Sequence, residues 1–371
     1  MNIEQRRIWI VIGTRPNFIK VTQFVKWSEK MDSFSVNIVH TGQHYDEKMA
    51  QIFFDQFGLL PDVFLNVKPD HPGKQIAETI SCLTDLFEEH KPDFVIVVGD
   101  VNSTLAGAIA ANKCQIPIGH LESGLRSFDK EMPEEHNRLV ADALSGIHFV
   151  TEDSGLRNLR AEGRAEKGIA YVGNTMIDTL VAFQKEIDQS EILDRIKMEP
   201  ENFALVTIHR PSNVDTKSGL EMLLSVLRLL VDSLPVVFPM HPRTAKNIAK
   251  YGFTEAFDEL KNLVLLEPLS YFDFQKLVKE CTFVLTDSGG IQEETTFLRK
   301  PCLTLRPNTE RPVTVEKGTN VLLSFDVEKI APYVNEILKG NFKSGEIPAY
   351  WDGQATKRVL ERIQGFFNQG F

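Results

Sequence analysis

The stretch Thr286-Asp287-Ser288-Gly289-Gly290-Ile291-Gln292-Glu293-Glu294 decides how the second half of this chain folds. The five residues before it, 281–285, form a short apolar run that is typical of a buried strand. Good helix formers follow the glycines, and we expect the carboxylates of this segment in the first turn of a helix. The pattern predicts a strand, a Ser-Gly-Gly turn and a helix.

The turn formed by Ser288, Gly289 and Gly290 is suited to a diphosphate. Glycines let a ligand approach the backbone closely, and the free N–H groups and dipole of a helix start favour an anion. Ser288 adds a hydroxyl donor, and Glu294, one turn into the helix, can accept hydrogen bonds from a ribose diol. The alternative is a plain strand-to-helix turn in which a glycine serves packing.

Apolar runs of this kind alternate with helical patterns along the whole chain. We expect strands at residues 8–12, 36–39, 94–98, 116–121, 147–150, 203–208, 235–239, 263–266, 281–285 and 302–305. Repeated alternation with fully apolar strands predicts parallel sheets covered by helices on both faces. The fold class is therefore α/β, with two doubly wound, Rossmann-like domains whose strand ends face each other across a cleft. We expect domains at residues 1–180 and 181–350, followed by a C-terminal helical segment at 351–371.

Two helices can be described further from their side chains. A long amphipathic segment begins near Pro72, and its apolar residues are Ile76, Ile80, Leu83 and Leu86. The helix after residues 94–98 is rich in alanine, which favours close packing against a sheet.

Composition excludes several classes of protein. The chain has 371 residues and a net charge of −10, which argues against a general nucleic-acid binder. Its four cysteines are scattered without metal-ligand or disulfide spacing, which suits a reducing cytoplasm. The first apolar run is too short for a signal peptide, and no run is long enough to span a membrane. We therefore expect a cytoplasmic protein with no nucleic-acid, membrane or metal partner.

Charged and polar side chains recur at the carboxyl ends of the predicted strands, where ligands bind in open α/β sheets. They include Arg15, Gln43, His44, Asp100 and Glu122 in the first half, and His209, His241 and Arg306 in the second. A ligand with a diphosphate at one end and a reacting polar group at the other fits this distribution. A nucleotide sugar is such a ligand.

The motifs that contain these residues resemble those of one family. They are GTRPNFIK (13–20), TGQH (41–44), GD (99–100), GHLESGLR (119–126), PEEHNR (133–138), GNTMID (173–178), HR (209–210), DSGGIQEE (287–294) and ERP (310–312). In this order, and over nearly the full length, the chain resembles the non-hydrolysing UDP-N-acetylglucosamine 2-epimerases. The resemblance implies the GT-B type of fold, with the last helix crossing back to the N-terminal domain, and we also expect a homodimer.

The resemblance further implies inversion of C2, turning UDP-GlcNAc into UDP-ManNAc for cell-surface polysaccharide precursors. UDP would be eliminated to leave a glycal and then added back, with no NAD and no metal. Loosening the C1–O bond first acidifies C2–H, which requires stabilisation of the departing diphosphate and proton-transfer groups on two faces of the sugar.

On this basis the candidate residues fall into two groups. The catalytic group is Asp100, Glu122, Glu134 and His209. The UDP-binding group is Arg15, Lys20, Phe274, Ser288, Gly289, Gly290, Glu294 and Arg311, and the resemblance implies that Phe274 lies near the uracil ring. Which carboxylate serves which face of the sugar stays open.

Several of these residues have a structural alternative. Asp100 could cap a helix, and Glu134 or Glu135 could only favour a helix dipole behind Pro133. His209 could be structural, and Lys20 could merely support Arg15 or Asp100 electrostatically.

Other functions are compatible with the same fold. A glycosyltransferase would pass the sugar to an acceptor, and a hydrolysing 2-epimerase would release free ManNAc. A catalytically inactive sensor would bind the nucleotide sugar without converting it. A relative within the family could act on a modified UDP-sugar such as a 2,3-diacetamido uronate. Many bacterial members are activated by UDP-GlcNAc at a second site, and residues 43–49 here lack the Arg and second Gln of the usual run. We therefore expect weak or absent activation, because Asp46 would repel a diphosphate.

Overall fold

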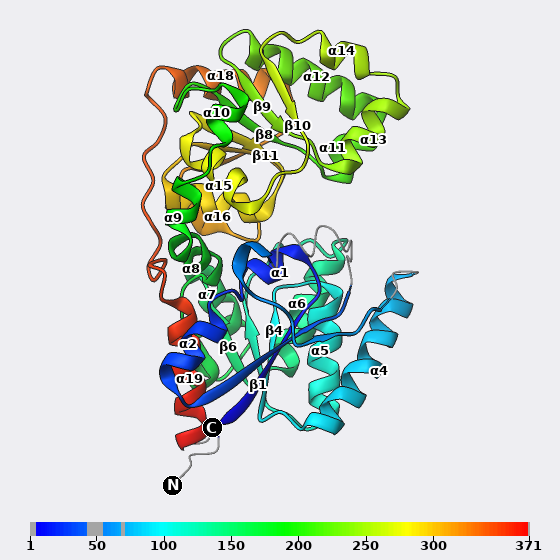
Figure 1. Cartoon of the computed structure of the whole chain (residues 1–371), viewed down its shortest axis with the longest axis vertical. Helices are drawn as coiled ribbons and strands as arrows, with labels where there is room; N and C mark the ends of the chain where they lie inside the picture. The colour runs from blue at the N-terminus through cyan, green and yellow to red at the C-terminus, as the bar shows by residue number, and fades with distance from the viewer. Residues whose placement is uncertain (1–4, 43–54, 68–70, 370–371) are drawn as a thin grey trace. The chain divides into compact units, whose positions relative to one another are not determined.

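The computed structural model describes residues 5–42, 55–67 and 71–369. The segment at residues 43–49, which contains Gln43, His44 and Asp46, lies outside the described residues. Tertiary contacts divide the chain into two compact units (Figure 1). Unit 1 is Met1–Ala182 with Ala349–Phe371, and unit 2 is Phe183–Pro348.

Unit 1 contains a parallel sheet of seven strands within the described ranges. They are β1 (Arg6–Ile12), β2 (Phe34–His40), β3 (Val63–Phe64), β4 (Phe94–Val98), β5 (Ile118–Leu121), β6 (Ile147–Val150) and β7 (Ile169–Tyr171). Their order is β3-β2-β1-β4-β5-β6-β7, so the direction of winding reverses between β1 and β4. Such a reversal separates the loops after two neighbouring strands and leaves a crevice where ligands bind.

Helices cover both faces of this sheet. They are α1 (Arg15–Ile19), α2 (Phe24–Met31), α4 (Pro72–His90), α5 (Asn102–Lys113), α6 (Pro133–Leu144), α7 (Asp153–Ala161), the 3₁₀ turn η1 (Glu166–Gly168), α8 (Thr175–Ala182) and α19 (Ala355–Gln369). Helices α4, α5 and α6 pack in a row, whereas α19 packs on α2 and α8 (Figure 1). The expected close packing of the alanine-rich helix is confirmed, because a Cβ on Gly107 of α5 would lie 3.1 Å from Val97 of β4.

The long helix predicted near Pro72 is confirmed as α4, and its buried face is partly polar. Leu83 is fully buried, whereas Ile76, Ile80 and Leu86 are half-buried. Gln75 and Thr79 take buried positions in the first two turns. The reason is polar packing between helices, since Nδ2 of Asn102 in α5 donates to Oε1 of Gln75 at 3.0 Å.

The C-terminal helix α19 belongs to unit 1. The carboxylate of Asp178 in α8 accepts hydrogen bonds from the backbone N–H groups of Ala355 and Thr356, at 3.0 and 2.6 Å. These two N–H groups belong to the first residues of the helix and have no partner within it. Asp178 therefore stabilises the start of α19 by accepting their hydrogen bonds. At the other end, the ring of Phe366 lies 5.8 Å from that of Phe94 in β4.

Unit 2 repeats the same winding with six strands. They are β8 (Ala204–Thr207), β9 (Val236–Pro239), β10 (Leu263–Leu266), β11 (Phe283–Thr286), β12 (Cys302–Leu305) and β13 (Asn320–Leu323). Their order is β10-β9-β8-β11-β12-β13 and every pair is parallel, so the reversal falls between β8 and β11. The predicted α/β class with two doubly wound sheets is confirmed.

The helices of unit 2 bury one apolar layer on each face of the sheet. They are α9 (Gln184–Asp188), α10 (Ile192–Ile196), α11 (Pro211–Val214), α12 (Lys217–Val231), α13 (Pro242–Lys250), α14 (Thr254–Asp258), α15 (Tyr271–Glu280), α16 (Gly289–Leu298), α17 (Pro312–Glu316) and α18 (Val327–Leu338). In one layer, apolar side chains of α12 and α18 pack against one face of the sheet. In the other layer, apolar side chains of α10, α15 and α16 pack against the opposite face. In the described ranges of both units, no helix is both long and apolar enough to cross a bilayer.

Candidate functional site

Asp100 of unit 1 follows β4, at the reversal of the strand order. Its backbone carbonyl accepts a hydrogen bond from Nδ2 of Asn137 at 2.8 Å, and its carboxylate lies 3.4 Å from Nη2 of Arg138. Both partners belong to α6, so this helix holds Asp100 while its side chain stays 27% exposed. The N-cap of the next helix, α5, is Val101, so the alternative that Asp100 caps it is wrong.

Glu122 follows β5, the neighbour of β4 in the sheet. Its Oε2 lies 2.7 Å from Nζ of Lys20, and both side chains are buried. The sequence grouped Lys20 with the UDP ligands, whereas here it contacts a predicted catalytic carboxylate. The pair is closely confined, because a Cβ on Gly99 would lie 3.4 Å from Nζ of Lys20 and 3.6 Å from Oε2 of Glu122.

A buried hydrogen-bond network lies behind this carboxylate. Nδ1 of His120 lies 2.6 Å from Oδ1 of Asp142, and Nε2 lies 2.7 Å from the carbonyl oxygen of Gly99. Burial alone would raise the pKa of Asp142, but the charge and hydrogen bond of His120, helped by His148 and Arg126, hold that pKa well below its ordinary value. These side chains are fully enclosed, so the network is a scaffold that joins the ends of β4 and β5.

The two glutamates at the start of α6 have different surroundings. Glu135 is buried and accepts hydrogen bonds from the backbone N–H and hydroxyl of Ser127, both at 2.9 Å, and from the N–H of Phe128 at 3.1 Å. Glu135 therefore fastens the loop before the helix. Glu134 is exposed and remains the member of the pair that a substrate could reach.

The remaining cation predicted in unit 1 is Arg15, which opens α1 directly after β1 and is half-buried. Arg15, Asp100 and Glu122 thus follow the carboxyl ends of β1, β4 and β5, which are consecutive in the sheet. The strand-end pattern seen in the sequence corresponds to one edge of this sheet.

In unit 2, the predicted strand, turn and helix around the glycines are confirmed as β11 and α16. Ser288 is the N-cap residue, and its side chain makes no capping hydrogen bond. The expected carboxylates in the first turn are wrong, because the helix begins only at Gly289 and Glu293 and Glu294 fall in its second turn. The first turn therefore carries no negative charge of its own, which favours an anion at its N–H groups.

Four buried charged side chains, Glu293, Arg306, Glu310 and Arg311, form what we call the charge cluster. Nε of Arg311 lies 2.7 Å from Oε2 of Glu293, and its Nη1 pairs with Oε1 of Glu310. Nη2 of Arg306 donates to Oε2 of Glu310 at 2.9 Å. A Cβ on Gly289 would lie 3.1 Å from Nη1 of Arg311, so the charge cluster borders the residue that opens α16.

The predicted uridine-binding side chains lie on neighbouring helices, since α15 contacts α16. Phe274 of α15 is half-buried and packs on the apolar layer of this face. Glu294 of α16 is buried, and its charge adds to the effect of burial in raising the pKa of Tyr271 well above its ordinary value. Tyr271 lies one turn before Phe274, so Glu294 faces the first turn of α15.

His209 follows β8 and is held by Asp287, which follows β11 on the other side of the reversal. Nδ1 of His209 lies 3.0 Å from Oδ1 of Asp287, and the backbone N–H groups of His209 and Arg210 also donate to this carboxylate. Burial alone would raise the pKa of Asp287, but the hydrogen bond and charge of His209, with the N–H of Arg210, lower it. Asp287 thus fixes the ring of His209, whose side chain is 39% exposed.

The sequence reasoning did not assign roles to Asp287, Arg306 or Glu310. Asp287 and Glu310 lie inside motifs that were recognised, and Arg306 was noted only as a polar residue at the end of a predicted strand. Asp287 contacts His209, 78 positions away, and no sequence spacing signals that pair. Arg306 and Glu310 are four residues apart.

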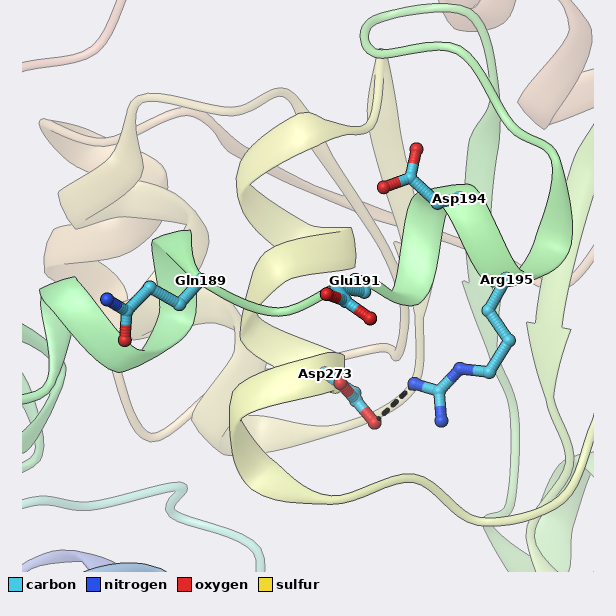
Figure 2. A pocket seen from close by; sticks show the side chains of 5 residues that line it. All are labelled: Gln189, Glu191, Asp194, Arg195 and Asp273. Atoms are coloured by element: carbon cyan, nitrogen blue, oxygen red, sulfur yellow. Dashed lines mark hydrogen bonds and ion pairs between the residues drawn. The ribbon is translucent and has the colours of Figure 1, made fainter.

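A separate hollow of about 520 Å³ lies on unit 2 and is lined by Gln189, Glu191, Asp194, Arg195 and Asp273. Figure 2 shows Arg195 directed at Asp273, 2.8 Å away, while Asp194 points away from this ion pair. Three carboxylates against one guanidinium make this hollow unsuitable for a diphosphate. Within the described ranges, no group of three or more His, Cys, Asp or Glu residues could hold a metal ion.

Comparison with known proteins identifies the family. The family model described as UDP-N-acetylglucosamine 2-epimerase matches residues 27–364. The chain is 39% identical over 365 residues to a UDP-N-acetylglucosamine 2-epimerase homolog of Methanococcus maripaludis, covering 96% of this chain and 99% of that protein. It is 36% identical over 361 residues to the UDP-2,3-diacetamido-2,3-dideoxy-D-glucuronate 2-epimerase of Pseudomonas aeruginosa, covering 96% of this chain and 99% of the relative.

Solved structures give the same result. The UDP-GlcNAc 2-epimerase of Methanocaldococcus jannaschii, in complex with UDP-GlcNAc and UDP, is 35% identical with a TM-score of 0.88, covering 97% of this chain and 99% of that one. A lipopolysaccharide outer core galactosyltransferase, 14% identical with a TM-score of 0.54 over 97% of this chain and 99% of that one, shares the fold alone, which is of the GT-B type. From its full-length similarity to these epimerases, the chain belongs to the UDP-N-acetylglucosamine 2-epimerase family.

Proposed function

We propose that this protein inverts C2 of a UDP-N-acetylhexosamine and converts UDP-GlcNAc to UDP-ManNAc without releasing free sugar. The observation that carries the proposal is the start of α16, where Gly289 borders the guanidinium of Arg311 and its partner Glu310, and where the first turn has no carboxylate of its own. A helix start with an adjacent guanidinium favours the binding of a diphosphate. A relative in the same family binds UDP-GlcNAc and UDP, which supports this ligand.

In the proposed reaction, the C1–O bond breaks first and its electron pair leaves with UDP. The cation-like C1 acidifies C2–H, a base removes that proton, and a C1–C2 double bond forms. A proton is then delivered to the opposite face of C2, and a phosphate oxygen of UDP attacks C1. The balance of atoms requires only UDP, a base and an acid.

Each predicted residue is given a role in this reaction. Unit 2 would hold UDP through Ser288, Gly289, Gly290 and Arg311, with the ribose at Glu294 and uracil near Phe274. His209, oriented by Asp287, would support the phosphates as their negative charge develops. In unit 1, Asp100, Glu122 and Glu134 would act on the sugar, and Arg15 would balance the diphosphate.

A second candidate substrate is a UDP-2,3-diacetamido uronate, which the name of the Pseudomonas aeruginosa relative specifies. Its ring reacts at the same carbon, and the diphosphate site would serve it equally. We prefer UDP-GlcNAc as the substrate for two reasons. The description of the matched family model names this sugar, and the structure of the Methanocaldococcus jannaschii relative contains it.

The test is incubation of the purified protein with UDP-GlcNAc alone in D₂O, followed by NMR of the products. We expect UDP-ManNAc with deuterium at C2, because carboxylates and imidazole exchange protons with solvent. Free ManNAc would indicate the hydrolysing reaction, and no conversion without an acceptor would favour a transferase. In a parallel incubation with the UDP-2,3-diacetamido uronate, conversion of that sugar but not of UDP-GlcNAc would select the second substrate. Epimerisation with hydrogen retained at C2 would overturn the elimination mechanism.

A further inference from the structure

One member of the charge cluster has more donors than partners. Arg306 follows β12 and is only 2% exposed. Its Nη2 donates to Glu310, whereas its Nε and Nη1 make no hydrogen bond to any residue in the described ranges. Buried polar groups are nearly always hydrogen-bonded, and a buried charge needs its partners most. Arg306 therefore lacks a partner that a ligand could supply.

The open donor is directed at the start of α16. A Cβ on Gly289 would lie 3.6 Å from Nη1 of Arg306, 3.1 Å from Nη1 of Arg311 and 3.0 Å from Oε1 of Glu310, a carboxylate that pairs with both arginines. Gly289 is the first residue of a ten-residue helix, so both guanidinium groups border the N–H groups that favour an anion.

The pairing within the charge cluster distinguishes the two arginines. Among the described residues, Arg311 contacts the carboxylates of Glu293 and Glu310, whereas Arg306 contacts only that of Glu310. The charge of Arg306 is thus the less compensated of the two. A diphosphate carries more negative charge than one guanidinium neutralises, and a second one would meet that need.

We propose that Arg306 is a second phosphate-binding guanidinium of this site, whose Nη1 donates to an oxygen of the nucleoside diphosphate. The inference rests on the proposed function and extends it by one residue that contacts the ligand. It excludes a purely structural role in which Arg306 acts only by holding Glu310 and, through it, Arg311.

The test measures binding of UDP and of uridine by calorimetry to the full-length protein and to Arg306→Met and Arg306→Lys. We expect Arg306→Met to weaken UDP binding at least roughly tenfold, as for loss of a charge-assisted hydrogen bond, with uridine affinity unchanged. Arg306→Lys should lose less, because it keeps the charge. The matched control is Arg299→Met, which changes an exposed arginine at the opposite end of α16 and should alter neither affinity.

Wild-type affinity for UDP in a folded Arg306→Met protein would overturn the inference, as would equal weakening of UDP and uridine. A double-mutant cycle with Arg311→Met separates contact from positioning. Direct contact predicts a further loss of UDP affinity when Arg306 is changed in the Arg311→Met background, and no further loss would overturn it. If Arg306→Met does not fold, Arg306→Lys is compared in the same cycle. Failure of the wild-type protein to bind UDP would instead contradict the proposed function itself.

Discussion

The amine of Lys20 lies 2.7 Å from Oε2 of Glu122, with both side chains buried at the carboxyl edge of the unit 1 sheet. A buried charge needs a partner of opposite charge, and Lys20 supplies one to Glu122. Lys20→Met would remove this partner and should disturb the position of Glu122 as a proton-transfer group. At neutral pH we expect kcat to fall roughly tenfold or more. The control is Lys26→Met on an exposed position of α2, and an unchanged kcat in Lys20→Met would contradict the pairing role.

The proposed proton-transfer role of the unit 1 carboxylates can be tested by substitutions that keep the size of the side chain. Glu122→Gln and Glu134→Gln should each lower turnover by about a hundredfold or more, the usual effect of losing one proton-transfer group. UDP affinity should change little, because the proposed phosphate ligands other than Arg15 lie in unit 2. Steady-state kinetics and calorimetry measure the two effects, with Glu131→Gln as an exposed control in the same loop. Loss of UDP affinity in parallel with turnover would assign these residues to binding instead.

The proposed binding of the diphosphate at the start of α16 can be tested by a substitution that fills the space in front of that helix. Gly290→Trp should abolish UDP binding, because the indole would occupy the space in front of the first helical N–H groups. Circular dichroism checks that the fold is retained, and Gly365→Trp in α19, where a side chain meets open space, provides the control. Unchanged UDP affinity in folded Gly290→Trp protein would place the diphosphate elsewhere.

Stability should depend on pH through His40 at the end of β2. Burial lowers the pKa of His40 to about 4, and its Nδ1 accepts a hydrogen bond from the N–H of Gly42 at 3.1 Å. Between this value and the unfolded pKa near 6.5, the unfolded chain binds a proton that the folded protein does not, so stability falls as pH is lowered through that window. The expected loss is about 2 kcal/mol at pH 5 relative to pH 7.

Urea denaturation of the wild-type protein and His40→Asn at the two pH values measures this effect. Asparagine keeps an acceptor for Gly42 but does not titrate, so the variant should lose less stability on acidification. His71→Asn is the matched control, because His71 accepts an equivalent hydrogen bond from Gly73 while exposed. The same acid dependence in His40→Asn and the wild-type protein would show that other groups cause it.

The fold could be predicted largely from local patterns, because central parallel strands are apolar on both faces. The central strands β4, β6 and β12 were predicted with their observed bounds, and so was the edge strand β10, whose four residues are all apolar. The short strands β3, β7 and β13 were not predicted. They also lie at sheet edges and are only partly buried, and β3 and β7 have only two and three residues, so they carry little of the apolar signal.

For the candidate site, the sequence by itself determined which residues end the strands and which glycines open α16, because both depend on local backbone and burial. Only the tertiary structure decided which charges meet. It paired Lys20 with Glu122, Asp287 with His209, and Arg311 with Glu293. Each choice depends on distances of a few ångströms between side chains from different elements, since electrostatic and hydrogen-bond energies change steeply over that range. Strand order and helix packing set those distances, and no spacing along the chain encodes them.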